Sequence, residues 1–149
     1  MKFMKRLQII LMFALIICAQ NVSLAHDRAI ESKQLPSKAI NFINNYFSGE
    51  KIALAKIDKE IFHTTYEVVL TNSIKIEFFK NGDWKNVDCR YSQVPVDIVP
   101  QQIINKVKEL YPDNYIIEID KESNEYEAKL NNKMELKFDS RFNLIDIDN

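Results

Sequence analysis

The chain contains few cysteine, histidine and glycine residues, which form disulfides, zinc sites and phosphate-binding loops in other proteins. Its 149 residues include two cysteines, two histidines and two glycines. The histidines, His26 and His63, lie far apart and no CxxC or HExxH pattern occurs, which excludes the common zinc motifs. Gly49 and Gly82 are too few and too distant to form a glycine-rich loop that cradles phosphate. A fold built from this sequence must therefore rest on an apolar core.

An excess of positive charge is also absent. The chain has 20 Lys and Arg against 21 Asp and Glu, and its basic cluster lies within residues 1–6. Phosphate binding depends on concentrated positive charge, so the composition argues against nucleic acid as a partner. It equally offers no basic surface to an anionic membrane.

Long hydrophobic runs are missing except at the N-terminus. An apolar stretch, residues 7–19, follows the basic cluster and is broken only by Gln8. Small residues in Ser23-Leu24-Ala25 complete the pattern of a secretory signal peptide, which predicts cleavage near Ala25 and a periplasmic or secreted location. The stretch is shorter than the roughly 20 residues that span a bilayer, so we expect no stable membrane insertion after signal removal.

Cysteine usage bears on both the leader and the fold. Lipid attachment at Cys18 is the alternative to cleavage after Ala25, although bulky Ile17 precedes the cysteine where such sites favour a small residue. Cleavage would remove 25 residues and three of the 20 basic side chains, which leaves 124 residues with 17 basic and 21 acidic side chains. That length suffices for one domain with a core of its own. Cys89 would then be alone, so no intramolecular disulfide could form.

The most informative feature is an internal echo. The stretch YEVVLTNSIKIEF, residues 66–78, returns as YEAKLNNKMELKF, residues 126–138. Alternating apolar residues, interrupted by a polar pair, predict an antiparallel hairpin in each copy. Upstream, LPSKAINFINNYF (35–47) matches VPQQIINKVKELY (99–111), and the spacing of apolar residues in both predicts two amphipathic helices that begin at a proline.

Each copy also contains strands on either side of its hairpin. The segments 51–60 and 114–122 alternate in hydropathy and share the tetrapeptide Ile-Asp-Lys-Glu. In the first copy a last strand follows an Asn-Gly turn signal and begins near Trp84, and in the second copy it begins near Phe142.

The same alignment predicts a packing role for the remaining thiol. Val87 and Cys89 match Ile145 and Ile147 in the second copy. Alternate residues of a strand share a face. We therefore expect Cys89 to be buried beside Val87, although a reactive or chain-linking thiol is the alternative.

These elements predict an α+β fold. Two tandem α-β4 repeats would form one antiparallel sheet, with both helices packed on one face and the other face open to solvent. The expected organisation is a signal peptide (1–25), an N-terminal extension (26–34), repeat 1 (35–89), a linker (90–98) and repeat 2 (99–149), the repeats forming a single structural domain.

This pattern resembles the PepSY-like family of small periplasmic proteins, which is related in fold to the beta-lactamase inhibitor protein. The likeness rests on two Pro-led helices, each followed by Y-E-x-x-L, an alternating hairpin and [WF]-x-x-[VI]-D, and it spans residues 35–148. The resemblance implies a secreted binding or inhibitory module with a curved sheet, and it provides no catalytic residue to carry over.

Residues suited to catalysis or metal binding are scarce. His63 has Thr64 and Thr65 nearby, but adjacent strand residues point to opposite faces, so no triad follows. Asp146 and Asp148 share a strand face and could hold calcium only weakly, without the glycine and the further oxygen ligands of a calcium loop. We therefore predict no enzyme, no catalytic residue, no metal site and no cofactor.

Differences between the two copies provide the functional lead. Val69 and Phe79 face away from the predicted core, whereas Lys129 and Asp139 occupy the matching positions. Exposed apolar and aromatic residues favour protein interfaces, although Phe79 could instead pack on a turn or be covered by another segment. The predicted partner-binding set adds two aromatic residues nearby in sequence and consists of Val69, Phe79, Trp84 and Tyr91.

Two functions remain open on these grounds. The first is a non-enzymatic secreted binding module that engages a protein or peptide of the periplasm or envelope through the open sheet face. Its more specific form is an inhibitor or regulator of a periplasmic enzyme such as a peptidase. The second is a small-molecule or metal-ion binding protein that uses a cleft between the repeats.

Overall fold

The computed structural model describes residues 28–60 and 62–149. The predicted signal peptide (1–25), Cys18 and His26 lie outside the described residues. None of the described helices is long and apolar enough to cross a membrane.

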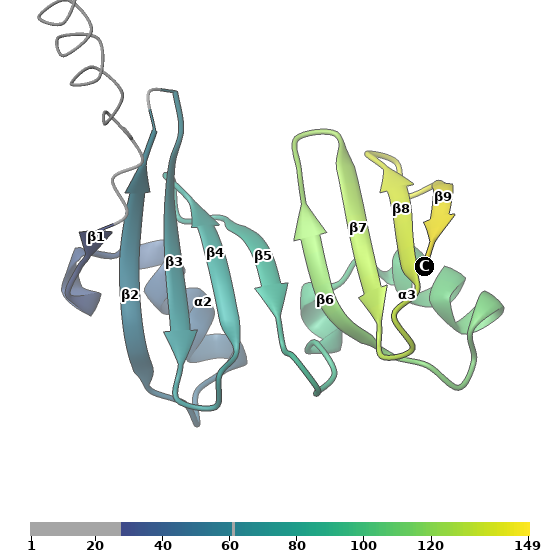
Figure 1. Cartoon of the computed structure of the whole chain (residues 1–149), viewed down its shortest axis with the longest axis horizontal. Helices are drawn as coiled ribbons and strands as arrows, with labels where there is room; N and C mark the ends of the chain where they lie inside the picture. Colours follow the sequence, from purple (N-terminus) through teal and green to yellow (C-terminus); the bar gives the residue numbers. More distant parts are fainter. Residues whose placement is uncertain (1–27, 61) are drawn as a thin grey trace, which may run out of the picture.

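One antiparallel sheet of nine strands forms the body of the protein, and its strands are arranged in chain order (Figure 1). Hairpins connect β2 through β5 and, separately, β6 through β9. The strands are β1 (Arg28–Ala29), β2 (Ile52–Lys59), β3 (Thr64–Leu70), β4 (Lys75–Phe79), β5 (Trp84–Asp88), β6 (Ile116–Lys121), β7 (Glu125–Leu130), β8 (Glu135–Asp139) and β9 (Leu144–Asp148).

Two α-helices, α2 (Ser37–Tyr46) and α3 (Gln101–Leu110), lie on one side of this sheet (Figure 1). Pro36 and Pro100 are their N-cap residues, where a helix needs no backbone donor. The 3-10 turns η1 (Ser32–Gln34) and η2 (Val96–Ile98) precede them. The chain is thus an α+β protein, as the sequence predicts.

The sheet face beneath the helices, which we call the inner face, supplies most of the core. Alternate strand residues point at the helices and are fully buried: Val68, Ile76, Phe78, Val87, Ile119, Ala128, Leu136 and Phe138. The helices contribute their apolar stripes, whose buried members are Ala39, Ile43, Ile103 and Val107. Phe42 of α2 packs edge-on against Phe78, with ring centroids 5.7 Å apart. Removing this apolar surface from water is the main stabilising term of the fold.

The sequence predicts eight strands, and the ninth, β1, comes from the N-terminal extension. Arg28 and Ala29 pair with Ile57 and Lys56 of β2. A strand of two residues has no periodic pattern by which it can be recognised in a sequence. β1 covers part of the free edge of β2, which reduces the backbone that β2 exposes to pairing with other chains.

The predicted alignment of the last strands is wrong by two residues. Trp84 and Leu144 take the same place, each opposite the buried phenylalanine of the preceding strand. Phe142, the predicted counterpart of Trp84, lies in the turn before β9 with φ 63°, a left-handed conformation that Gly82 adopts in the turn before β5 with φ 83°. The prediction is wrong because it matches Phe142, an aromatic residue in a turn, to Trp84, an aromatic residue at the start of a strand.

The shared tetrapeptide Ile-Asp-Lys-Glu also occupies non-equivalent positions. Ile57 pairs with Tyr66, whereas Ile119 pairs with Ala128, so the residue of β2 that matches Ile119 is Ala55. The hairpins differ in length as well, because β2 has eight residues and β6 has six. The β2–β3 hairpin consequently reaches further beyond the sheet than the β6–β7 hairpin does (Figure 1).

Cys89 is buried, as predicted, but not because its counterpart is an isoleucine. The corrected register matches it to Asn149 at the end of β9. Cys89 is 3% exposed because β6 continues the sheet beside it, and its backbone N–H donates to the Ile117 carbonyl at 2.8 Å. Burial and the charge of Asp88 raise the pKa of the thiol to about 11, against a hydrogen bond from Ser92 that lowers it. The alternative of a reactive thiol is therefore disfavoured.

The turn between β4 and β5 docks against the start of α2. A Cβ on Gly82 would lie 2.9 Å from the Cβ of Pro36 and 3.0 Å from the Cβ of Lys38, closer than real Cβ atoms pack. Asp83 forms an ion pair with Lys38, and the hydrogen bond from Lys38 lowers the pKa of Asp83 despite some burial. The missing side chain of Gly82 thus allows this turn to touch the helix.

We predict that Gly82→Ala lowers the free energy of unfolding by about 1–3 kcal/mol, because it adds a clash to a left-handed backbone. Gly49→Ala is the matched control, since a Cβ there would meet nothing within 4 Å. That change should stay within about 0.5 kcal/mol of the original protein. Urea unfolding of the three proteins measures both values, and equal losses for the two variants would contradict the docking of the turn.

We also predict slow reaction of the Cys89 thiol in the folded protein. A pKa raised from 9.0 to about 11 leaves about 100-fold less thiolate at a pH near 8 than an ordinary thiol has, and burial restricts access further. Labelling with a disulfide reagent should be slow in buffer and complete in urea. Rapid labelling of the folded protein would place the thiol at the surface.

Candidate functional site

The outer face of the sheet, opposite the helices, carries a series of ion pairs. Lys75 Nζ lies 3.0 Å from a carboxylate oxygen of Glu67 and 3.1 Å from one of Glu77. Lys85 Nζ continues the series at 3.7 Å from Glu77 and 3.6 Å from Glu122. We call this series the charge ladder, and its members are Lys56, Glu67, Lys75, Glu77, Lys85 and Glu122.

Lys75 neutralises two carboxylates that strand pairing brings together. Glu67 and Glu77 are direct cross-strand partners, and like charges in that arrangement destabilise a sheet. Partial burial of Lys75 disfavours its charged form, but hydrogen bonds to both carboxylates outweigh this and raise the pKa of Lys75. The lysine therefore stays charged at neutral pH and holds the centre of the ladder together.

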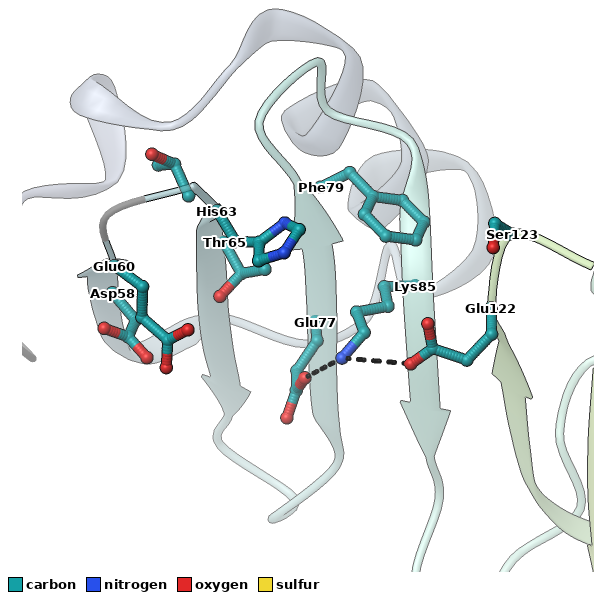
Figure 2. A pocket seen from close by; sticks show the side chains of 10 residues that line it. Asp58, Glu60, His63, Thr65, Glu77, Phe79, Lys85, Glu122 and Ser123 are labelled. Atoms are coloured by element: carbon teal, nitrogen blue, oxygen red, sulfur yellow. Dashed lines mark ion pairs between the residues drawn. The ribbon is translucent and has the colours of Figure 1, made fainter. Parts of the chain in front are cut away.

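A pocket of about 560 Å³ lies on the outer face between the β2–β3 hairpin and the residues that follow β6. We call it the junction pocket. Figure 2 shows Phe79 and Lys85 between His63 on one side and Glu122 on the other, with Glu122 entering from the neighbouring hairpin. The residues that determine its chemistry are Asp58, Glu60, Glu77, Phe79, Lys85 and Glu122.

Negative charge predominates in the junction pocket. Four carboxylates line it against the single ammonium group of Lys85, which is already paired with two of them, Glu77 and Glu122 (Figure 2). Phe79 adds an aromatic ring beside them. Oδ1 of Asp58 is buried and has no hydrogen-bond partner among the described residues, whereas buried acceptors are normally paired. The pocket is therefore suited to a cation, above all one attached to an apolar stem.

The carboxylates of the junction pocket are not assembled into a metal centre. Within residues 28–60 and 62–149, no group of three or more His, Cys, Asp and Glu side chains is arranged to hold a metal ion. Calcium requires six to eight oxygen ligands at roughly 2.3–2.6 Å. The carboxylates would have to converge, or accept water, before they could bind such an ion.

His63 lines the junction pocket together with Thr64 and Thr65. Its side chain is exposed. Its backbone carbonyl accepts a hydrogen bond of 2.8 Å from the Glu60 N–H. His63 is thus held beside the junction pocket by the backbone of the β2–β3 hairpin.

Val69 and Phe79 both lie on the outer face. The cross-strand pair Glu67–Glu77 lies between them, so the two residues occupy separate parts of that face. Phe79 lines the junction pocket, and Val69 is next to Leu54 of β2 at the far end of the hairpin. The structure thus places one of the two predicted outer-face residues in a hollow and the other beside Leu54, at a distance from that hollow.

Trp84 lies on the inner face. It is the partner of Phe78 in the strand register, and its ring lies 6.5 Å from that of Tyr126. It is partly buried against the core. A binding surface on the outer face cannot include its side chain, so Trp84 does not join Phe79.

Tyr91 is 91% exposed and follows β5, at the end of the sheet opposite to Phe79. It lines a second hollow of about 750 Å³, together with Tyr115 and Lys129. The Tyr115 hydroxyl donates to the Tyr91 carbonyl at 3.3 Å. The four residues of the predicted partner-binding set therefore lie in four separate parts of the structure, and of the four Phe79 alone lines the junction pocket.

The charged residues of the junction pocket are not predicted when the two copies are compared at apolar positions only. A signal for them exists in the sequence, because Glu77 and Lys85 match Lys137 and Ile145 once the register is corrected. Glu122 gives no such signal. Its place beside Lys85 depends on the pairing of β5 with β6, which a sequence pattern does not reveal.

Comparison with known proteins identifies the family. A family model described as "Putative beta-lactamase-inhibitor-like, PepSY-like" matches residues 64–146. No curated protein matches the chain. The family match agrees with the resemblance that the two hairpins and their flanking strands suggest.

Three solved structures share this fold at a TM-score of 0.80. A "putative calcium-regulated periplasmic protein" from Bacteroides thetaiotaomicron is 46% identical, over 83% of this chain and 97% of that one. A "putative periplasmic protein from DUF2874 family" of Bacteroides vulgatus is 43% identical, over 88% and 99%. A "putative periplasmic protein of unknown function" from the same species is 31% identical, over 83% and 100%. The chain belongs to the PepSY-like family of beta-lactamase-inhibitor-like proteins.

Proposed function

We propose that this protein is a non-enzymatic binding protein of the periplasm and that the junction pocket is its binding site. We infer that the chain consists of two tandem α-β4 copies whose meeting creates this pocket. The periplasmic relatives support the location. The beta-lactamase-inhibitor-like description of the family supports inhibition or regulation of a secreted enzyme, such as a peptidase, as the form that binding takes.

The observation that carries this proposal is the wall of the junction pocket. Phe79 contributes an aromatic ring to a wall that also contains four carboxylates and one lysine, in a hollow large enough for a side chain of a partner. An Arg or Lys side chain would gain charge attraction from Glu77 and Glu122 and a cation–π contact with Phe79. The partner is therefore a periplasmic protein or peptide that presents a basic residue.

Site-directed photocrosslinking tests the binding face. Benzoylphenylalanine in place of Phe79 should form covalent adducts with a partner in the periplasmic fraction of the producing cells, because the reactive ring would line the junction pocket. The matched control carries the same group in place of Tyr46, which is exposed on α2 at the other side of the sheet. Adducts at Phe79 and none at Tyr46, identified by mass spectrometry, are the expected result.

The second part of this test removes negative charges from the junction pocket and measures the adduct yield at Phe79. Glu77→Gln with Glu122→Gln should reduce the adduct yield at Phe79 several-fold, since each lost charge-assisted contact weakens binding. Asp97→Asn with Asp113→Asn removes two exposed carboxylates elsewhere and should leave the yield unchanged. Equal adduct formation from Phe79 and Tyr46, or no effect of the glutamate changes, would count against the junction pocket.

Calcium is a second candidate ligand for the junction pocket. Four carboxylates line the pocket and favour this ligand, among them that of Asp58, whose Oδ1 has no hydrogen-bond partner among the described residues. The relative from Bacteroides thetaiotaomicron carries the description calcium-regulated, which supports the same ligand. Calcium would then occupy the cleft between the two copies, where it could compete with a basic residue of a partner.

We predict that calcium, if it binds, raises the stability of the protein by about 2.7 kcal/mol at 100 times its Kd. Asp58→Asn should abolish most of the gain, and Asp97→Asn, at an exposed carboxylate outside the pocket, should not. Thermal unfolding with calcium, and with magnesium for comparison, measures the effect. No shift at millimolar calcium, or the same shift in the Asp58→Asn protein, would exclude this site.

A further inference from the structure

The last strand of the sheet, β9, exposes apolar residues at an unpaired edge. In the described part of the chain no strand pairs with its outer side (Figure 1). Ile147 is 41% exposed and Ile145 is 52% exposed, whereas Val87, the register counterpart of Ile147, is fully buried. Exposed apolar edge strands invite pairing with another chain.

The β5–β6 junction shows what a partner does at the equivalent edge. β5 takes the same place in its half of the sheet as β9 does, and β6 pairs with it through Val87–Ile119 and its neighbours. The N–H of Cys89 donates to a carbonyl of β6. At β9 the matching amide is that of Asn149, and no strand accepts from it in the described part of the chain.

Two aspartates cover the edge amides of β9. The N–H of Ile147 donates to Asp146 Oδ1 at 3.0 Å, and the N–H of Asn149 donates to Asp148 Oδ1 at 2.9 Å. A strand that pairs with β9 must displace both carboxylates from these amides. The displaced carboxylates then project from the outer face of the sheet, where basic residues directly opposite them on the partner strand would pair with them.

We propose that the β9 edge is a docking site for a cationic, alternating strand of a partner protein. The basic residues of that strand would lie opposite Asp146 and Asp148, and an apolar residue between them would lie opposite Ile147, as Ile119 lies opposite Val87. Main-chain hydrogen bonds would supply affinity and the two aspartates would supply selectivity. This proposal does not depend on the junction pocket, which lies elsewhere on the sheet.

Charge argues against a second copy of this chain as the occupant. Antiparallel pairing of two β9 strands about Ile147 would place Asp146 opposite Asp148 at both ends of the ladder. Like charges directly opposite one another destabilise a pair of strands. An acidic strand would place like charges opposite both aspartates, and a neutral strand would offer no cation to Asp148, whose neighbour on β8 is Glu135, so selectivity for a basic strand follows from the same residues.

Peptide binding to the full chain tests the proposal. The probe is a short, end-blocked peptide of alternating lysine and valine, compared with a glutamate–valine peptide and with a lysine–valine peptide whose backbone is N-methylated. We expect the first to bind about tenfold or more tightly than either control. It should also slow hydrogen exchange of the Ile147 and Asn149 amides, which locates the peptide at β9 and not in the acidic junction pocket.

Variants separate the role of the aspartates from that of net charge. Asp146→Asn with Asp148→Asn should reduce the preference for lysine over glutamate to nearly one, while Asp97→Asn with Asp113→Asn should retain it. Unchanged exchange at Ile147 and Asn149 in the presence of bound peptide would overturn the proposal. So would equal binding of the N-methylated peptide, or protection of the two amides that grows with protein concentration alone, which would indicate self-pairing.

Discussion

The rest of the structure depends on the burial of one face of a nine-stranded sheet beneath two helices. Phe78 and Phe138 are fully buried there, and the apolar stripes of α2 and α3 close over them. The described part of the chain has no second layer of helices, so the outer face of the sheet is exposed to solvent. A solvent-exposed sheet face favours polar residues, and here acidic and basic side chains alternate on it as the charge ladder. The surface available for function is therefore set by the packing of the core.

The pairing of β5 with β6 gives the protein its candidate site. Three residue pairs join the halves there, among them Val87 with Ile119, so the core continues from one half into the other. On the outer face the same junction brings Glu122 to Lys85. Asn86 binds the carboxylates of Glu118 and Asp120 at this place, and burial raises the pKa of Asp120 although the hydrogen bond from Asn86 opposes it. Neither half alone contains this arrangement.

Much of the fold could be predicted from the sequence, because apolar periodicity determines both helices and the four central hairpin strands. What could not be predicted depends on backbone conformation or on long-range pairing. Phe142 occupies a positive-φ turn position that usually takes glycine, and this shifted the predicted alignment by two residues. The contrast of Phe79 with Asp139 correctly predicts that Phe79 lies on the outer face, whereas closeness in sequence does not predict the face of Trp84, which lies on the inner one. Glu122 needed the tertiary structure.

The central claim is that the protein works through the outer face of its sheet and not through its helices. Carboxylate footprinting of the protein in complex with a photocrosslinked partner measures this directly by mass spectrometry. The account predicts that Glu77 and Glu122 lose reactivity in the complex, while Glu109, exposed on α3, keeps it. Protection of Glu109 with unchanged reactivity at Glu77 and Glu122 would contradict it.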